Sequence, residues 1–483
     1  MYLKKLHISN FRCFRDYTIE FAPGVTVLFG KNGSGKTTLI HAIHKALSML
    51  MYTKNIYESV LVKGEKRKRI KDYKSITKNN KYLHPKGFAS DDFNNLEDAF
   101  IEVEATADFD QTLSDVNWKM SVKANSNKLR PTEFEEAFLS FYSWYENGGQ
   151  LPLLAYISDC FPHKQDYKKS KVKAKIRELR NFAYFNWDEE EGCTNEWIKR
   201  LEDNLKQQIS LVSKGKVTQK TDGKFTYEIK EDDKPRYESL CSEETAIGKC
   251  FKDFSMDVVF TSPEAIKFKE FSLGKTMQNE GKLCIQTESG DEYAFRKLPA
   301  GYKRLFYIVL DLAYRSFILS KEGRTDIPGI VIIDEIDLHL HPQLEKVALN
   351  CLTKAFPKVQ FIVSTHSPLV LTGTSTAQGN NKILRMSSLN KSNNEKTPAG
   401  PSPMFDIYGL DLNTSTQLVM NVNPNDDELN RLITRSAYMI NNNLKEQAEN
   451  LKTYILQKGF LSSKGIDERI SELLKKPNNE VDK

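Results

Sequence analysis

Runs of hydrophobic residues along the chain predict an α/β architecture. Patterns of helical period cover 38–47 and 305–319. Alternating apolar and polar positions within 256–297 predict several further short strands. Continuous apolar runs, typical of strands buried on both faces, occur at 25–29, 151–157, 330–333 and 360–365. Buried strands that alternate with helices indicate a mixed sheet flanked by helices.

The composition is that of a multidomain protein. The chain has 483 residues, of which 39% are hydrophobic and 28% charged, and its net charge is +6. This length exceeds what one compact core accommodates, so we expect more than one domain. Its 7 cysteines form no C-x-x-C pair, so neither a zinc site nor a disulfide framework is expected. Residues 1–6 show no signal-peptide pattern, and no apolar run is long enough to span a bilayer, so we expect a cytoplasmic protein without membrane contact.

A glycine-rich loop between the first buried strand and the first helix predicts a phosphate-binding site. Residues 30–37 fit the pattern G-x-x-x-x-G-K-[ST]. Glycines let backbone N–H groups turn inward around an anion, and the helix N-terminus adds its partial positive charge. Lys36 would reach the β- and γ-phosphates of ATP, and the Thr37 hydroxyl would bind Mg²⁺. The predicted nucleotide-binding residues are Gly30, Asn32, Gly33, Ser34, Gly35, Lys36, Thr37 and Thr38.

Two carboxylates follow the buried strand at 330–333. Ligands of open α/β sheets lie at the carboxyl ends of the strands, so Asp334 is predicted to hold Mg²⁺ through water. Glu335 would orient or deprotonate the attacking water. Another buried strand ends at His366, which could donate a hydrogen bond to the γ-phosphate. Lys36, Glu335 and His366 are therefore the candidate catalytic residues.

The order of these motifs resembles that of ABC-type ATPases. More narrowly, residues 6–14 resemble the N-termini of the SMC-like group, and 334–342 with 364–368 resemble its OLD and RecF branch. The resemblance covers residues 1–50 and 290–370. It implies an ABC-type P-loop ATPase head with ATP and Mg²⁺ as cofactors. It also implies a head-to-tail dimer or higher homo-oligomer, with ATP bound between copies.

The resemblance identifies residues 298–304 as the signature loop, which in this group faces the nucleotide of the opposing subunit. The group carries a serine where Pro299 stands, so a hydroxyl contact to the γ-phosphate is missing and ATP turnover is expected to be slow. Gly301 and the following helix N-terminus could still bind the phosphate through backbone N–H groups. Lys303 and Arg304 are expected to add positive charge nearby.

Three further polar segments have no single predicted role. Arg12 matches an arginine that lies near the phosphates in some SMC-like ATPases, but it could equally be a solvated arginine in a turn. Residues 87–93 lie where this group carries a glutamine that senses Mg²⁺, and no such glutamine is found. The most basic window, the loop at 63–86, would either contact DNA or RNA or remain a solvated loop.

The motifs divide the chain into four predicted regions. The last region is expected to end in an amphipathic helix over 426–456 and a shorter one over 466–474, which either pack back on the head or dock a partner or a second copy. The regions are an N-terminal ATPase lobe at 1–160, a helical and β insertion at 161–255 that serves as a lid or arm, a C-terminal ATPase lobe at 256–372, and a loop-rich, then helical region at 373–483.

Among SMC-like ATPases, the chain most resembles the ATPase subunit of Septu-type antiphage systems, the PtuA family, and its relatives in some retron systems. The Pro-Ala-Gly-Tyr-Lys-Arg sequence at 299–304 and the helical tail after 366–368 carry this resemblance. It implies an HNH nuclease subunit (PtuB-like) as partner, since no nuclease motif is visible in this chain, and DNA or a retron nucleic acid as a further candidate ligand. The alternatives are a RecF-like DNA-binding repair ATPase and a nucleotide sensor that hydrolyses ATP very slowly.

Overall fold

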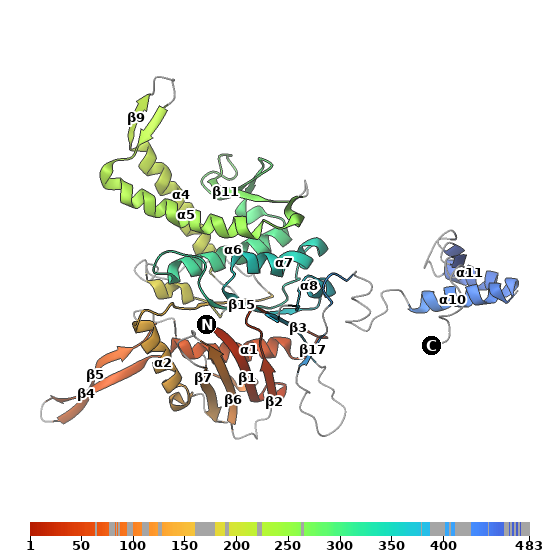
Figure 1. The fold of residues 1–483 in the computed structure, drawn as a ribbon, viewed down its shortest axis with the longest axis horizontal. Helices are drawn as coiled ribbons and strands as arrows, with labels where there is room; N and C mark the ends of the chain where they lie inside the picture. The colour runs from red at the N-terminus through yellow and green to blue at the C-terminus, as the bar shows by residue number, and fades with distance from the viewer. Residues whose placement is uncertain are drawn as a thin grey trace. The chain divides into compact units, whose positions relative to one another are not determined.

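The computed structural model forms two compact units, Met1–Gly409 and Leu410–Lys483, which are described separately. Figure 1 shows the ribbon of both units. The structure describes all residues except 63–64, 77–82, 84, 86, 94–99, 109–114, 124–127, 160–178, 189–192, 220–224, 262–264, 378, 387–400, 405–406, 411–426, 443, 458–462, 464–465, 468–469, 472–473 and 475–483.

A six-stranded sheet with strand order β17-β16-β3-β15-β14-β8 forms the centre of the first unit. All of its strands except β17 run parallel. The continuous apolar runs of the sequence become strands that are buried along their whole length. In chain order the strands are β3 (Val25–Phe29), β8 (Leu153–Ile157), β14 (Gly329–Ile333), β15 (Val359–Thr365), β16 (Asn381–Arg385) and β17 (Ser402–Pro403).

Helix α1 (Lys36–Leu47) follows β3 and lies between the central sheet and a second, antiparallel sheet (Figure 1). The second sheet has strand order β2-β1-β6-β7. Its strands are β1 (Tyr2–Phe11), β2 (Phe14–Glu20), β6 (Phe100–Asp108) and β7 (Val116–Lys123). Gln360 on β15 joins the two sheets, because its buried amide donates hydrogen bonds to the carbonyl oxygens of Leu3, at 2.9 Å, and Ala22, at 2.7 Å. The P-loop helix is therefore held on both sides.

Helices α6 (Ala300–Leu319) and α7 (Pro342–Ala355) pack on each other, and α6 also packs on β8. Helix α6 carries a buried ion pair, in which Arg315 Nε lies 2.6 Å from Asp311 Oδ2. Trp197 donates a hydrogen bond of 2.7 Å to the other oxygen of Asp311, and Arg315 Nη1 binds the carbonyl oxygens of Ala183 and Phe185. This network anchors the insertion to the head.

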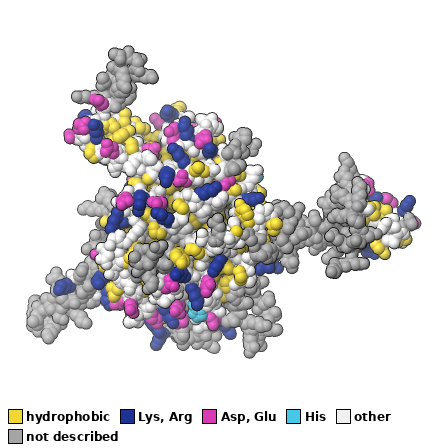
Figure 2. All heavy atoms as spheres, viewed as in Figure 1, with side chains coloured by type: hydrophobic (Ala, Val, Ile, Leu, Met, Phe, Trp, Pro, Cys, Tyr) yellow, Lys and Arg dark blue, Asp and Glu magenta, His cyan; other side chains and the backbone are white. Residues whose placement is uncertain are grey.

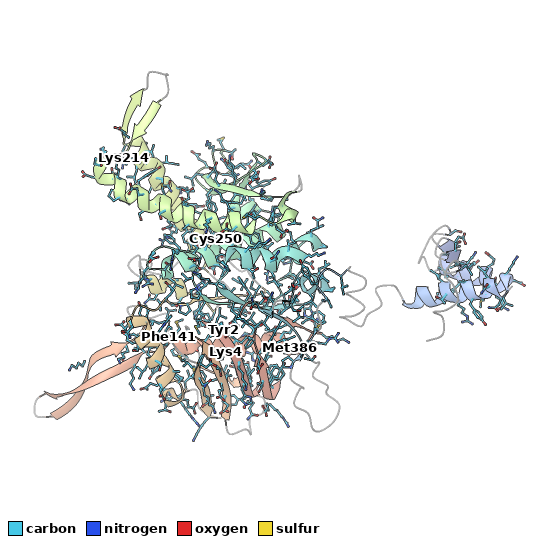
Figure 3. The ribbon with its side chains drawn as sticks, in the orientation of Figure 1. Tyr2, Lys4, Phe141, Lys214, Cys250 and Met386 are labelled. Atoms are coloured by element: carbon cyan, nitrogen blue, oxygen red, sulfur yellow. The ribbon has the colours of Figure 1, made fainter. Side chains whose placement is uncertain are left out.

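The insertion consists mainly of α4 (Thr194–Ser213) and α5 (Lys234–Phe254), which pack side by side. A small ribbon of β9 (Lys216–Gln219) and β10 (Phe225–Glu228) connects their ends. In Figure 3, Lys214 marks the ribbon end of α4 and Cys250 marks the part of α5 near the head. The other elements are α2 (Glu135–Glu146), α8 (Pro368–Thr372), a sheet of β11 (Phe268–Leu273), β12 (Leu283–Thr287) and β13 (Glu292–Ala294), and short 3-10 helices at 48–51, 90–92, 131–133, 180–184, 231–233, 258–261 and 295–297.

The basic window at 63–86 was expected to be a loop, and for its first part this is wrong. Strand β5 (Glu65–Lys74) pairs antiparallel with β4 (Lys54–Val62). These two strands form a ribbon of their own and join neither large sheet. Elsewhere on the visible face, the described acidic and basic side chains are interspersed (Figure 2).

In the second unit, two helices occupy the described part of 426–456, where a single helix was predicted. Helix α10 (Asp427–Asn441) and helix α11 (Lys445–Gln457) pack against each other around a small core of Ile433, Ala437, Ile455, Ile466 and Ile470. The predicted continuous helix over 426–456 is wrong, because α10 ends at Asn441 and α11 begins at Lys445. Asn442, which follows α10, belongs to a residue type that forms helices poorly. The shorter helix predicted at 466–474 lies partly outside the described residues.

A search of the helices in the described ranges found none with the length and apolar character needed to cross a bilayer.

Candidate nucleotide-binding site

The loop between β3 and α1 has the geometry that a phosphate cradle requires. Gly33 and Gly35 have positive φ angles of 77° and 91°, which side chains disfavour. A Cβ on Gly30 would lie 2.8 Å from the carbonyl oxygen of Met386, and one on Gly35 would lie 2.7 Å from the Phe14 ring. Lys36, only 6% exposed, donates hydrogen bonds to the carbonyl oxygens of Gly30, at 2.9 Å, and Lys31, at 3.2 Å. The main chain of the loop therefore surrounds the Lys36 ammonium.

The other P-loop positions face different environments. Asn32 and Thr37 are exposed, and Thr38 is half-buried. The Ser34 hydroxyl is buried, and within the described part of the chain it has no hydrogen-bond partner. The pKa of Lys36 is lowered because burial disfavours its charge, although the nearby carboxylates of Asp334 and Glu335 oppose this effect. A triphosphate bound here would meet a lysine that has already left bulk water.

Asp334 connects the P-loop to the ends of two neighbouring strands. Its Oδ2 accepts a hydrogen bond of 3.2 Å from Thr37 Oγ1, and its Oδ1 accepts one from Ser364 Oγ. The structure therefore brings together Thr37 and Asp334, the two predicted Mg²⁺ ligands. A hydroxyl and a carboxylate are hard oxygen donors of the kind that Mg²⁺ prefers, so these residues fit the ion. When bound with ATP, Mg²⁺ would neutralise phosphate charge beside them.

Glu335 has a strained backbone. Its φ is 49°, in the left-handed region that a glutamate rarely adopts. Its N–H donates a hydrogen bond of 2.8 Å to Ser364 Oγ. Burial raises the pKa of the Glu335 carboxyl, as do the charges of Asp334, Asp159 and Asp337. A raised pKa improves a carboxylate as a general base near neutral pH.

His366 lies immediately after β15. Burial lowers its pKa, and the positive charge of Lys36 lowers it further, which indicates that the two predicted site residues are close. The imidazole is therefore neutral at pH 7 and has one N–H to donate. Beside it, Thr365 Oγ1 accepts a hydrogen bond of 2.9 Å from Ser367 N and donates one to Asp337.

The signature loop leads directly into α6. Pro299 is the N-cap residue, and Gly301 lies in the first turn. A Cβ on Gly301 would lie 3.1 Å from the carbonyl oxygen of His339, so the signature loop packs on the loop that follows β14. The expectation that Arg304 adds charge to a phosphate is wrong, because this side chain is fully buried and binds main-chain carbonyl groups. Lys303 instead lies over the Tyr307 ring, with Nζ 5.6 Å from its centroid.

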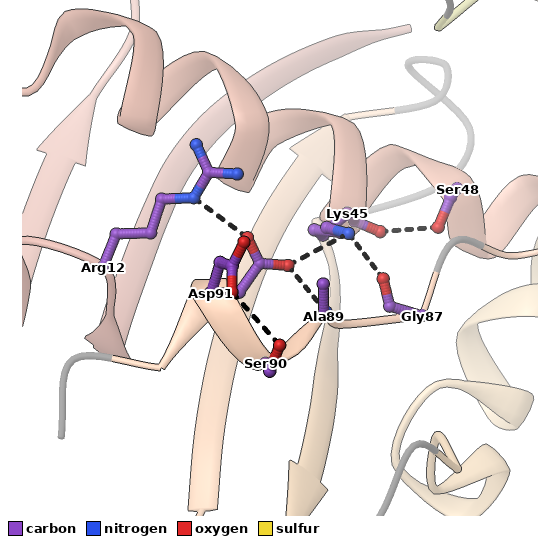
Figure 4. A network of polar contacts seen from close by, with 8 residues as sticks. Arg12, Lys45, Ser48, Gly87, Ala89, Ser90 and Asp91 are labelled. Carbon is purple, nitrogen blue, oxygen red and sulfur yellow. Dashed lines mark hydrogen bonds and ion pairs between the residues drawn. The ribbon is translucent and has the colours of Figure 1, made fainter. Parts of the chain in front are cut away.

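Arg12 lies in the turn after β1, and its half-buried side chain pairs with Asp92. Its Nε donates a hydrogen bond of 2.9 Å to the carboxylate of Asp92 (Figure 4). Its backbone N–H donates a hydrogen bond of 2.7 Å to the carbonyl oxygen of the same residue. Asp92 is 1% exposed and also pairs with Lys45 at 3.3 Å. Burial opposes the charge of Asp92, but the N–H of Ala89 and the two cations outweigh it and lower its pKa.

This cluster lies beside the P-loop, because Cys13, next to Arg12, comes within 3.2 Å of where a Cβ on Gly35 would be. The segment 87–93, which carries no glutamine, thus supplies Asp92 to this cluster. Contact between Arg12 and a bound nucleotide stays a prediction.

The contacts of three residues at this site were not predicted. Ser364 stood in a recognised motif, but only its contacts with Asp334 and Glu335 show its role. Asp92 pairs with an arginine far from it in the sequence, and no local pattern indicates this. Arg304 looks like a surface charge because it follows Lys303.

The described residues also line an open pocket of about 910 Å³ between α4, α5 and the end of α6. Trp197, Arg200, Leu240 and Phe317 are among its lining residues, and none of the predicted site residues lines it. The P-loop site is instead an open surface at the carboxyl ends of the central strands, since Asn32 and Thr37 are exposed there.

Residues 1–371 match the model of a protein family described as the AAA ATPase domain. The chain belongs to this family. The predicted P-loop ATPase head with its mixed sheet, and the similarity to retron and Septu ATPases, are confirmed. The AAA ATPase domain covers the P-loop, the carboxylates after β14 and His366, and membership in the family implies nucleotide binding.

The chain is also similar to several named proteins. The "Retron Vc95 probable ATPase" of Vibrio cholerae serotype O1 biovar El Tor is 28% identical over 400 residues, which cover 73% of this chain and 68% of that protein. "Septu protein PtuA" of Bacillus mycoides (strain KBAB4) is 42% identical over 77 residues, 16% of this chain and 10% of that one. A solved structure of the Smc head bound to the C-winged helix domain of ScpA aligns with a TM-score of 0.41 at 15% identity, covering 84% and 98% of the two chains.

Proposed function

We propose that this protein is an ATPase that pairs with a second copy of itself around ATP and thereby regulates a partner nuclease in an antiphage defence complex. The main support for nucleotide binding is the hydrogen bond between Thr37 and Asp334, which joins the P-loop to the end of β14. The exposure of Asn32 and Thr37 on one side, and of Pro299 and Ala300 on the other, favours two half-sites that a second copy completes.

In this mechanism the P-loop cradles the triphosphate and Lys36 neutralises its charge. Glu335 accepts a proton from the attacking water, and His366 donates its N–H to the γ-phosphate. The signature loop of the second copy contributes the backbone N–H groups around Gly301. Each copy contributes one P-loop surface and one signature-loop surface. A twofold pair therefore contains two such sites and leaves neither surface free for a third copy.

ATP acts in this proposal as a ligand that stabilises the paired state. A ligand shifts an equilibrium only through its different affinity for the two states. With ATP at about 100 times its dissociation constant, each site stabilises the pair by roughly 2.7 kcal/mol, and hydrolysis withdraws this contribution. The nucleotide state can therefore set whether a bound nuclease is held inactive.

The partner is proposed to be an HNH nuclease (PtuB-like). The retron and Septu relatives support a role in a defence complex. The test is co-expression of this chain with an HNH protein of the PtuB type, followed by affinity purification and a DNA-cleavage assay with and without ATP. We expect a complex of fixed stoichiometry whose cleavage rate changes at least about tenfold with nucleotide. Failure of the two chains to co-purify would contradict the proposed partner.

Nucleic-acid binding by the head itself is a second candidate function. The β4–β5 ribbon favours it, because a two-stranded ribbon can enter the major groove of DNA and β5 contains the basic run Lys66–Arg69. A RecF-like repair ATPase would bind duplex DNA tightly without a protein partner.

Neutralising Lys66, Arg67, Lys68 and Arg69 together tests this candidate. If the ribbon contacts phosphates, the slope of log K against log salt should fall by up to about 3–4, since each neutralised phosphate contributes about 0.9. Duplex and single-stranded DNA of mixed sequence serve as probes in fluorescence anisotropy. Lys249 and Lys252, both exposed on α5, provide a control double variant. An unchanged affinity and slope would remove the ribbon from this function.

A further inference from the structure

Arg304 occupies an unusual place for a charged side chain. It lies in the second turn of α6 and is fully buried. One of its terminal nitrogens, Nη2, donates to the carbonyl oxygens of Asp334, at 3.0 Å, and Glu335, at 3.1 Å. The other, Nη1, lies 3.4 Å from the carbonyl oxygen of Ser158 and 3.5 Å from that of Asp159. A single guanidinium thus bridges the ends of β8 and β14.

Fold stability alone does not favour an arginine here. Burial lowers the pKa of Arg304 to about 10, which leaves it charged at neutral pH inside the protein. Burying a charge costs free energy even when hydrogen bonds satisfy it, and an apolar side chain would fill a helix core at lower cost. What the guanidinium adds is geometry, because its planar fork can hold several acceptors at fixed angles.

The acceptors define the conformation of one residue. The carbonyl groups of Asp334 and Glu335 belong to the two peptide units on either side of the Glu335 Cα. Holding both units fixes the φ and ψ of Glu335. This residue has a φ of 49°, a strained value that persists only where the surroundings impose it. The side chain of Glu335 leaves the strand end in the direction that this backbone dictates.

We propose that Arg304 is a positioning residue that holds Glu335 in its hydrolytic conformation and couples it to the signature loop. Arg304 lies one helical turn after Ala300 and Gly301, on the same helix. A displacement of this helix end by a second copy's nucleotide would move the guanidinium and, with it, the two peptide units around Glu335. The inference rests on the proposed ATPase function of the pair.

Arg304→Lys and Arg304→Met test this inference. An ammonium keeps the charge but cannot hold the spread carbonyl groups, and methionine removes the charge at similar length. For both variants we expect kcat of ATP hydrolysis to fall roughly 10- to 100-fold, as small misplacements of catalytic groups do. KM and the dissociation constant of a fluorescent ATP analogue should change less than about threefold, because the hydrogen bonds of Arg304 hold carbonyl groups at the ends of β8 and β14.

Arg315 offers a matched control on the same helix. It is also buried, and it also binds two carbonyl groups, those of Ala183 and Phe185, but it lies among the anchors of the insertion. Arg315→Lys should lower the melting temperature and leave kcat per folded molecule unchanged. Circular dichroism and thermal melts of all variants give the folded fraction.

The outcomes separate the two proposals. A wild-type protein that binds no ATP would contradict the proposed function itself. A wild-type protein that hydrolyses ATP, with Arg304→Lys and Arg304→Met equally fast, would overturn only the positioning role. Variants in which kcat and nucleotide affinity fall together, in proportion to lost folded protein, would show a structural role and likewise overturn it.

Discussion

Replacing Lys36 with alanine is expected to lower the affinity for ATP by roughly 100-fold, because a charge-assisted hydrogen bond contributes about 1.5–3 kcal/mol and each 1.4 kcal/mol is tenfold. In the structure Lys36 donates hydrogen bonds to the loop carbonyl groups of Gly30 and Lys31, and its ammonium is buried where a phosphate would meet it. The protein should remain folded, since the substitution removes a buried charge rather than stranding one.

Titration with a fluorescent ATP analogue measures this effect. Lys31→Ala is the control, because Lys31 is exposed in the same loop and is expected to change the affinity little. The Lys36→Ala variant should also fail to pair in the presence of ATP, as judged by sedimentation. If it retains nucleotide and pairs as the parent does, the P-loop does not bind the triphosphate.

Replacing Glu335 with glutamine is expected to slow hydrolysis by on the order of 100-fold or more while ATP binding is retained. Glutamine has nearly the same shape but cannot accept the proton of the attacking water. With hydrolysis slowed, the ATP-bound pair should accumulate. Sedimentation with ATP should therefore show more pairs for the variant than for the parent, and without ATP the two proteins should be alike.

The pH dependence of hydrolysis gives a second readout of Glu335. Burial and the neighbouring carboxylates raise its pKa, so the parent should gain activity with rising pH through a pKa above that of an ordinary glutamate. This limb of the profile should be absent in Glu335→Gln. Glu345→Gln is the control, because Glu345 is also a half-buried carboxyl with a raised pKa but binds Ser367. Equal rates for Glu335→Gln and the parent would instead favour the nucleotide sensor that Pro299 suggests.

Local chemistry explains which parts of the site could be predicted. The strand at 25–29, the glycine loop and the following helix are specified by neighbouring residues, and the structure has them with α1 beginning at Lys36. Asp334 follows a fully apolar strand, and its approach to Thr37 follows from the rule that ligands lie at the carboxyl ends of parallel strands.

The other parts depend on contacts between residues far apart in the chain. Nothing near Arg304 in the sequence shows that β8 and β14 will present their carbonyl groups to it. Asp92 pairs with Arg12 because β1 and the segment before β6 are brought together by the second sheet. The first part of the basic window forms strand β5 because β4, which has few charged residues, pairs with it. The number of charged residues in a segment does not show whether another segment will pair with it as a strand.

The central claim is that each ATP is bound between the P-loop of one copy and the signature loop of another. Mixing two inactive variants tests it most directly: Lys36→Ala, which keeps its signature loop, and Gly301→Asp, which keeps its P-loop and places a negative charge where the phosphate would lie. Mixed pairs contain one intact site. We predict that an equal mixture recovers about a quarter of the parent ATPase rate, because about half of random pairs are mixed and each has one working site of two. A mixture as inactive as its two components would contradict the account.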